Sequence, residues 1–172
     1  MSPQSAPESD RASAMRVMRG EEIKGRWARV VRCLTLPSFA EATSWVVCLG
    51  NMSRYGHQPD GQAHFFTWRE GLGEEAGRGH LTSGGKPDVE HVLIDLTAED
   101  LGETLAPLNS ISVPVLLRNT DEGLDGTTVE FAMHFGPSQV ECSWWEDGPA
   151  EWVDFVGAVR EVERRLDRVL KR

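Results

Sequence analysis

The segment from about 149 to 170 carries the strongest folding signal in the chain. Its apolar residues recur three and four positions apart, which is the period of one face of an α-helix. A stripe of this kind is stable when it packs against another apolar surface. We therefore expect a long amphipathic C-terminal helix on the core, with these residues buried: Trp152, Phe155, Val156, Val159, Val162, Leu166, Val169 and Leu170.

The start of this helix is also predicted. Pro149 suits the first turn, because the amide hydrogen that proline lacks would have no partner there. Asp147 or Gly148 is the expected N-cap residue, and Glu151 lies in the favourable field of the helix N-terminus. Four basic residues suit its negative C-terminal end: Arg164, Arg165, Arg168 and Lys171.

Two segments of alternating apolar residues, 128–135 and 140–145, precede the helix. Turn residues separate them, so we expect an antiparallel hairpin with one apolar face. The alternation places Trp144 on the inward face with Val140 and Cys142 and points Trp145 the other way.

Other short apolar segments predict further strands, namely Trp45–Leu49, His64–Trp68, Val89–Leu96 and Ile111–Leu117. A second helix is expected directly after the segment Val89–Leu96, because Thr97 and Asp100 have the spacing of a capping box. Segment 15–36 is ambiguous. Its apolar spacing favours a helix, whereas paired β-branched valines leave a strand over 27–36 open.

The length of 172 residues fits one domain. Residues 1–14 are rich in Ser, Pro, Ala and charge and are expected to be a disordered tail before a domain at 15–172. Residues 69–88 contain six glycines and predict a long loop, either functional or disordered. The expected fold class is α+β. It has one antiparallel, possibly mixed, sheet of about five to six strands, packed by the long C-terminal helix and one or two shorter helices.

Charge divides the chain into an acidic body and two basic ends. Residues 35–159 hold 20 acidic and five basic residues, whereas 1–34 and 160–172 each have a local balance of +3 within a net charge of -9. Such a body repels phosphates and argues against nucleic acid, but it suits a basic protein partner. No apolar segment is long enough to span a membrane, and three cysteines without CxxC spacing fit a reducing, cytoplasmic compartment.

Motifs for chemistry are weak. The five histidines lack metal-binding spacing; His57 and His64, which flank Asp60, are the only metal candidates, and no metal or cofactor is expected. There is no GxSxG motif, and the glycine-rich Gly77–Lys86 segment lacks the Walker spacing. Acidic pairs such as Glu99-Asp100 leave open an alternative, a small hydrolase or carbohydrate-active enzyme that uses dispersed carboxylates and histidines.

A resemblance is carried by residues 124–156, LDGTTVEFAMHFGPSQVECSWWEDGPAEWVDFV. The DGT turn, two short strands, tryptophan pair, P-x-E-W motif and closing helix resemble the C-terminal part of small bacterial proteins of unassigned function. The size, acidity and α+β pattern are also similar to immunity proteins that neutralise bacterial toxins. This resemblance implies a bacterial, non-enzymatic protein and assigns no functional residue.

We therefore expect a cytoplasmic binding protein of immunity type that neutralises a basic toxin or another basic protein through an acidic surface. Trp145, if exposed, is an aromatic side chain beside the carboxylates of Glu146 and Asp147, and this combination suits a cationic partner. A structural or scaffold subunit is a further alternative. The candidate partner-binding residues are Trp145, Glu141, Glu146, Asp147, Glu151, Asp121 and Glu122.

Overall fold

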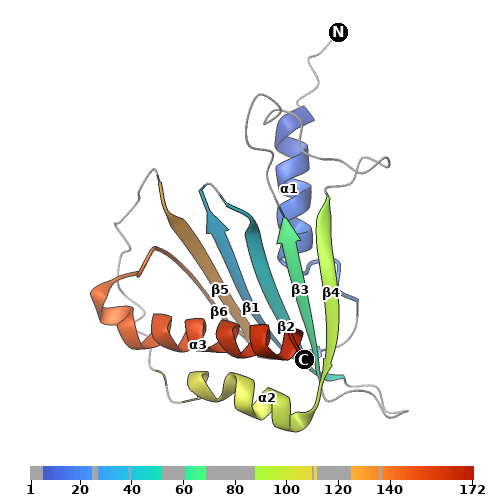
Figure 1. The fold of residues 1–172 in the computed structure, drawn as a ribbon, viewed down its shortest axis with the longest axis vertical. Helices are drawn as coiled ribbons and strands as arrows, with labels where there is room; N and C mark the ends of the chain where they lie inside the picture. Colours follow the sequence, from blue (N-terminus) through green and yellow to red (C-terminus); the bar gives the residue numbers. More distant parts are fainter. Residues whose placement is uncertain are drawn as a thin grey trace.

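A six-stranded sheet forms the centre of the fold in the computed structural model (Figure 1). The structure describes residues 6–24, 27–38, 40–51, 61–68, 88–109, 111, 125–135 and 137–172. Every neighbouring pair of strands is antiparallel, and the order is β4-β3-β2-β1-β5-β6. The expected α+β class and antiparallel sheet are confirmed. The strands are β1 Trp27–Pro37, β2 Ala42–Asn51, β3 Gly61–Trp68, β4 Val89–Leu96, β5 Thr127–Phe135 and β6 Ser138–Trp145.

Helix α3 (Val153–Leu170) lies across one face of the sheet, with α2 (Ala98–Leu105) beside it (Figure 1). The 3-10 turns η2 (Ala150–Trp152) and η1 (Ala106–Leu108) precede α3 and follow α2. Most of the expected apolar stripe is confirmed as core: Trp152, Phe155, Val156, Val159, Val162 and Leu166 are buried, whereas Val169 and Leu170 are partly buried. Trp144 is buried beneath this stripe, but Val140, which was expected on the same inward face, is 46% exposed. The rings of Trp144, Trp152 and Phe155 meet edge to face with centroids 5.6, 6.0 and 6.3 Å apart, an arrangement that aromatic pairs favour.

Helix α1 (Ala6–Met18) covers part of the opposite face, where it contacts β3 and β4 (Figure 1). Ala14 and Met18 are fully buried in a second apolar cluster with Val46 and Phe66. Over residues 6–14 the structure differs from the expected disordered tail, because the helix begins at Ala6; residues 1–5 lie outside the described residues. This polar segment forms a helix because the sheet offers an apolar surface on which Ala14 and Met18 pack.

The helix expected over 15–36 is wrong in its second half, where the chain forms β1. This strand lies between β2 and β5 and is covered on both faces. Val31 packs toward α3, whereas Leu34 packs in the cluster beneath α1. A strand buried on both sides does not alternate, so its apolar spacing imitated that of a helix.

The two helix starts gave different outcomes. The capping box is confirmed, since Thr97 Oγ1 accepts from the amide of Asp100 at 3.1 Å and the Asp100 carboxylate accepts from the amide of Thr97 at 3.4 Å. The N-cap expected at Asp147 or Gly148 is wrong. Pro149 caps η2, and α3 follows without a side-chain cap. Gly148, at φ 71°, closes a turn by donating to Trp145 O at 2.8 Å, so the helix starts later.

Candidate functional site

Trp145, the aromatic residue expected to make contact with a partner, is half-buried. Its indole lies against Gly126, so closely that a Cβ on that glycine would overlap the ring. Its neighbour Glu146 has φ 50°, and its Oε1 accepts from the amide of Thr127 at 2.7 Å. Both side chains therefore hold the end of β6 against the start of β5.

The other candidates at this end of the sheet are exposed but mostly paired. Asp147 forms an ion pair with Arg160 at 2.8 Å. Glu141 lies 3.8 Å from Arg32 and 3.7 Å from His134. Glu151 is exposed in η2, directly before α3. The remaining candidates Asp121 and Glu122, like His57, the 112–117 part of the expected fourth strand and the 69–87 part of the expected loop, lie outside the described residues.

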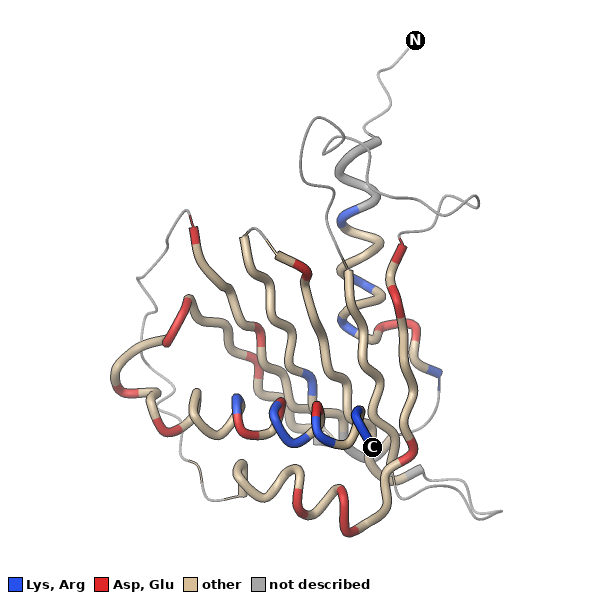
Figure 2. Tube along the Cα trace, in the orientation of Figure 1, with Lys and Arg blue, Asp and Glu red and all other residues tan. Residues whose placement is uncertain are grey.

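The topology brings a second group of acidic residues to one edge of the sheet. Strand β4 is at the edge of the sheet, and α2 follows it (Figure 1). Between 88 and 109 the chain has no Lys or Arg, and Figure 2 shows the acidic positions along β4 and α2. We call this surface the acidic edge; it comprises Asp88, Glu90, Asp95, Glu99, Asp100 and Glu103.

Apolar side chains interrupt the acidic edge on both faces of its strand. Val92 is 44% exposed and Leu93 50% exposed, on opposite sides of β4. Because β4 is the outermost of the described strands, the backbone amides and carbonyls on its outer side pair with no other described strand. The acidic edge therefore combines charge, apolar area and main-chain hydrogen-bonding groups, as in surfaces that pair with an extended segment.

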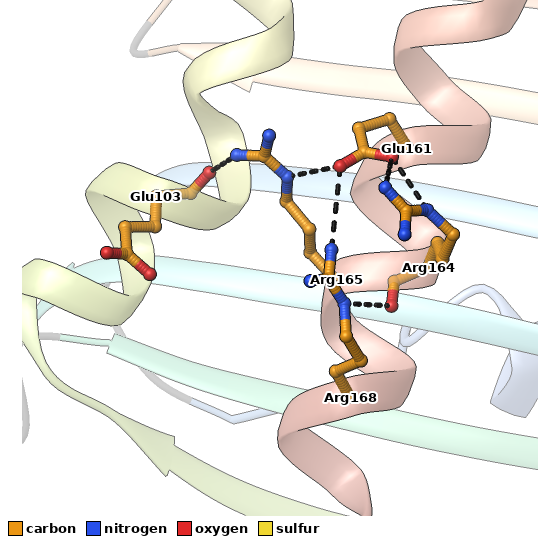
Figure 3. Close-up of polar contacts among 5 residues, drawn as sticks. All are labelled: Glu103, Glu161, Arg164, Arg165 and Arg168. Atoms are coloured by element: carbon orange, nitrogen blue, oxygen red, sulfur yellow. Dashed lines mark hydrogen bonds and ion pairs between the residues drawn. The ribbon is translucent and has the colours of Figure 1, made fainter.

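Between α2 and α3 lies a groove of about 500 Å³ whose lining includes four arginines. Glu161 is the centre of its polar network (Figure 3). Arg164 Nε and Arg165 Nε donate to this carboxylate at 2.8 and 2.6 Å, and Arg168 lies 3.6 Å away. Hydrogen bonds from Arg165 and Arg164 lower the pKa of Glu161, so it stays ionised.

These arginines also tie the two helices together. Arg165 donates to the backbone carbonyl of Glu103, and Arg172 pairs with Asp100 at 3.0 Å. The basic residues at the C-terminal end of α3 line this groove. Its guanidinium groups are engaged by carboxylates and carbonyls of the same chain.

A histidine pair that the sequence did not reveal lies on the opposite face. His64 Nδ1 and His91 Nε2 are 3.1 Å apart, on adjacent strands β3 and β4. Burial lowers the pKa of His64 to about 4 and also lowers the pKa of His91, so both rings are neutral near pH 7. His91 is 27 residues from His64, and only the strand register brings them together.

The three cysteines and one glutamate bear on nucleophilic chemistry. Burial raises the pKa of Cys33 well above its ordinary value, that of Cys48 to about 12 and that of Cys142 to about 11, so all three thiols are neutral. Burial also raises the pKa of Glu163, which accepts a hydrogen bond from Thr35 Oγ1 at 3.1 Å. These cysteines behave as small apolar residues of the core.

Comparison with known proteins adds no assignment. The chain matches no protein-family model, and a search of curated proteins finds no similar sequence. Among the described residues, no cluster of three or more His, Cys, Asp or Glu side chains is arranged to hold a metal ion. No helix in the described ranges is both long and apolar enough to cross a membrane.

Proposed function

We propose that this chain is a non-enzymatic binding protein that masks a basic protein, in the manner of an immunity protein that neutralises a toxin. The observation that carries the proposal is the acidic edge, with six carboxylates on or next to β4 and α2 and no basic residue between 88 and 109. Arg172 pairs with one of them, Asp100, and the excess of negative charge attracts an oppositely charged partner and accelerates its association.

The acidic edge suits this role better than the turn around Trp145. At the turn, Glu146 and Asp147 are held by Thr127 and Arg160 of the same chain. At the edge, Glu90 and Asp95 are exposed on the outermost strand, although Asp95 also accepts a hydrogen bond from Gln62 Nε2 at 3.1 Å. A partner can therefore meet the charges and the main chain of β4 together.

The expected mode of binding is addition of a basic, extended segment of the partner to β4. Main-chain hydrogen bonds would supply part of the affinity, and Val92 and Leu93 offer apolar contacts on either side. Lys and Arg on the added strand would face the carboxylates. Opposite charges placed across a strand pair are favourable, whereas like charges are not.

The same argument disfavours a second copy of this chain as the occupant. Self-pairing of β4 would place side by side two strands that carry Glu90 and Asp95 and no Lys or Arg. Repulsion among them opposes the dimer that a scaffold subunit would form. A basic partner removes this repulsion.

Charge reversal of the acidic edge tests the proposal. The binding partner to be used is the product of the neighbouring gene, titrated calorimetrically at low and high salt. The double variant Glu90→Lys, Asp95→Lys should weaken binding at least about tenfold and flatten its salt dependence. The matched control, Glu151→Lys with Asp154→Lys, makes the same charge change at the start of α3 and should alter affinity by less than about twofold.

Two outcomes oppose the proposal. Binding that is insensitive to salt removes the electrostatic basis. A larger loss in the control variant than in the edge variant moves the binding surface to the turn around Trp145.

A further inference from the structure

The histidine pair lies beside a hollow that the proposed partner surface does not use. The hollow has a volume of about 330 Å³, and both imidazoles and Phe66 line it together with residues of α1 and the turn after it. The His64 and His91 rings are nearly parallel, at 2°, with centroids 5.2 Å apart. Phe66 stacks on His91 with centroids 4.5 Å apart, so neighbouring side chains fix the ring orientation.

The polar groups of the pair are incompletely satisfied. His64 is 6% exposed, and its Nε2 is buried without a hydrogen-bond partner. His64 Nδ1 faces His91 Nε2, and there is room for only one proton between them. Without that proton, each of the two nitrogens carries a lone pair. A cation bound between the two rings would take both facing lone pairs, with the protons then on His64 Nε2 and His91 Nδ1.

We propose that His64 Nδ1 and His91 Nε2 are two ligands of a site for a divalent transition-metal ion of the kind that imidazole prefers, Zn²⁺, Cu²⁺ or Ni²⁺. Zinc–imidazole bonds of about 2.0–2.1 Å place two ligand nitrogens about 2.9 Å apart at a right angle and about 3.4 Å apart at the tetrahedral angle. The separation of 3.1 Å lies between these values.

The surroundings complete the argument. Glu22 and Lys24 line the same hollow and are exposed, so one acidic and one basic side chain border it and water has access to the remaining positions of the ion. The ion would join β3 to β4 on the face that α1 covers. The inference is independent of the proposed function, since it involves none of the carboxylates of the acidic edge.

Calorimetric titration of Zn²⁺ into the full-length, untagged, metal-stripped chain tests the site. We expect one ion per chain with micromolar affinity. His91→Asn, at an exposed position, should lower the affinity at least about tenfold. His134→Asn on β5 is the matched control and should leave it unchanged. Circular dichroism checks that each variant keeps its fold.

Nuclear magnetic resonance locates the ion. On addition of Zn²⁺ the imidazole nitrogens of His64 and His91 should shift together, and those of His134 should not. No binding to the wild-type chain overturns the site, as does binding that His91→Asn leaves intact. A shift confined to histidines other than this pair is equally contrary to it.

Discussion

The indole of Trp145 lies over Gly126, leaving no space for a side chain at that position. A Cβ on Gly126 would overlap both the ring of Trp145 and Oε1 of Glu146. This contact joins the turn before β5 to the end of β6, and Glu146 strengthens it through its hydrogen bond to the Thr127 amide. The DGT turn and the tryptophan pair are therefore two halves of one packing arrangement.

Gly126→Ala should destabilise the fold by about 1–3 kcal/mol, because the added methyl group has no space under the indole. Urea denaturation measures the change. Gly157→Ala is the matched control: its Cβ meets no atom within 4 Å on α3, so it should stabilise the helix by up to about 1 kcal/mol. Equal effects of the two substitutions would contradict the steric argument.

Thr97→Ala should cost about 1 kcal/mol of folding free energy, because the hydroxyl that accepts from the Asp100 amide is lost. Thr97→Ser keeps that hydroxyl and should retain most of the stability. The midpoint of thermal unfolding distinguishes the two variants. An alanine variant as stable as the serine variant would show that the cap contributes nothing.

Much of the fold follows from sequence periodicity, whereas β1 does not. Helix α3 and the β5–β6 hairpin are one-sided elements, so their spacing alone identifies them. β1 is buried on both sides, and only the presence of its neighbours β2 and β5 distinguishes it from a helix. Residues 6–14, which were expected to be part of a tail, belong to α1. This helix packs on an apolar face of the sheet that local periodicity does not reveal.

Candidate sites were harder to predict than the elements that carry them. The exposed position of Glu90 and Asp95 depends on β4 being outermost, and strand order is not encoded in local periodicity. His64 and His91 meet through the β3–β4 register, with no spacing motif in the sequence. Alternation along β6 predicts that Trp145 points away from the core, but it cannot reveal the contact with Gly126, which is 19 residues earlier in the chain.

Glu163 should make stability depend on pH. Burial raises its pKa, and Asp167 adds to the effect. At pH values between the ordinary and the raised pKa, the folded chain therefore holds a proton that the unfolded chain has released. Stability from this group is complete below the ordinary pKa of a glutamic acid and is lost as pH rises through the raised value.

Glu163→Gln stays neutral and keeps an acceptor for Thr35 Oγ1. It should therefore stabilise the fold at neutral pH by on the order of 1 kcal/mol, with the gain disappearing in acid. Urea denaturation at both pH values measures it, and the exposed Glu90→Gln serves as control. A gain that persists unchanged in acid would point to a cause other than ionisation.

Hydrogen exchange tests most directly whether a basic partner adds to the acidic edge. The exchange of backbone amides in β4 and β6, the two outer strands, is compared with and without the neighbouring gene's product. Pairing with β4 should slow exchange in Val89–Leu96 and leave Ser138–Trp145 unchanged. Protection confined to β6 and the turn that follows it, with none in β4, would contradict the proposed surface.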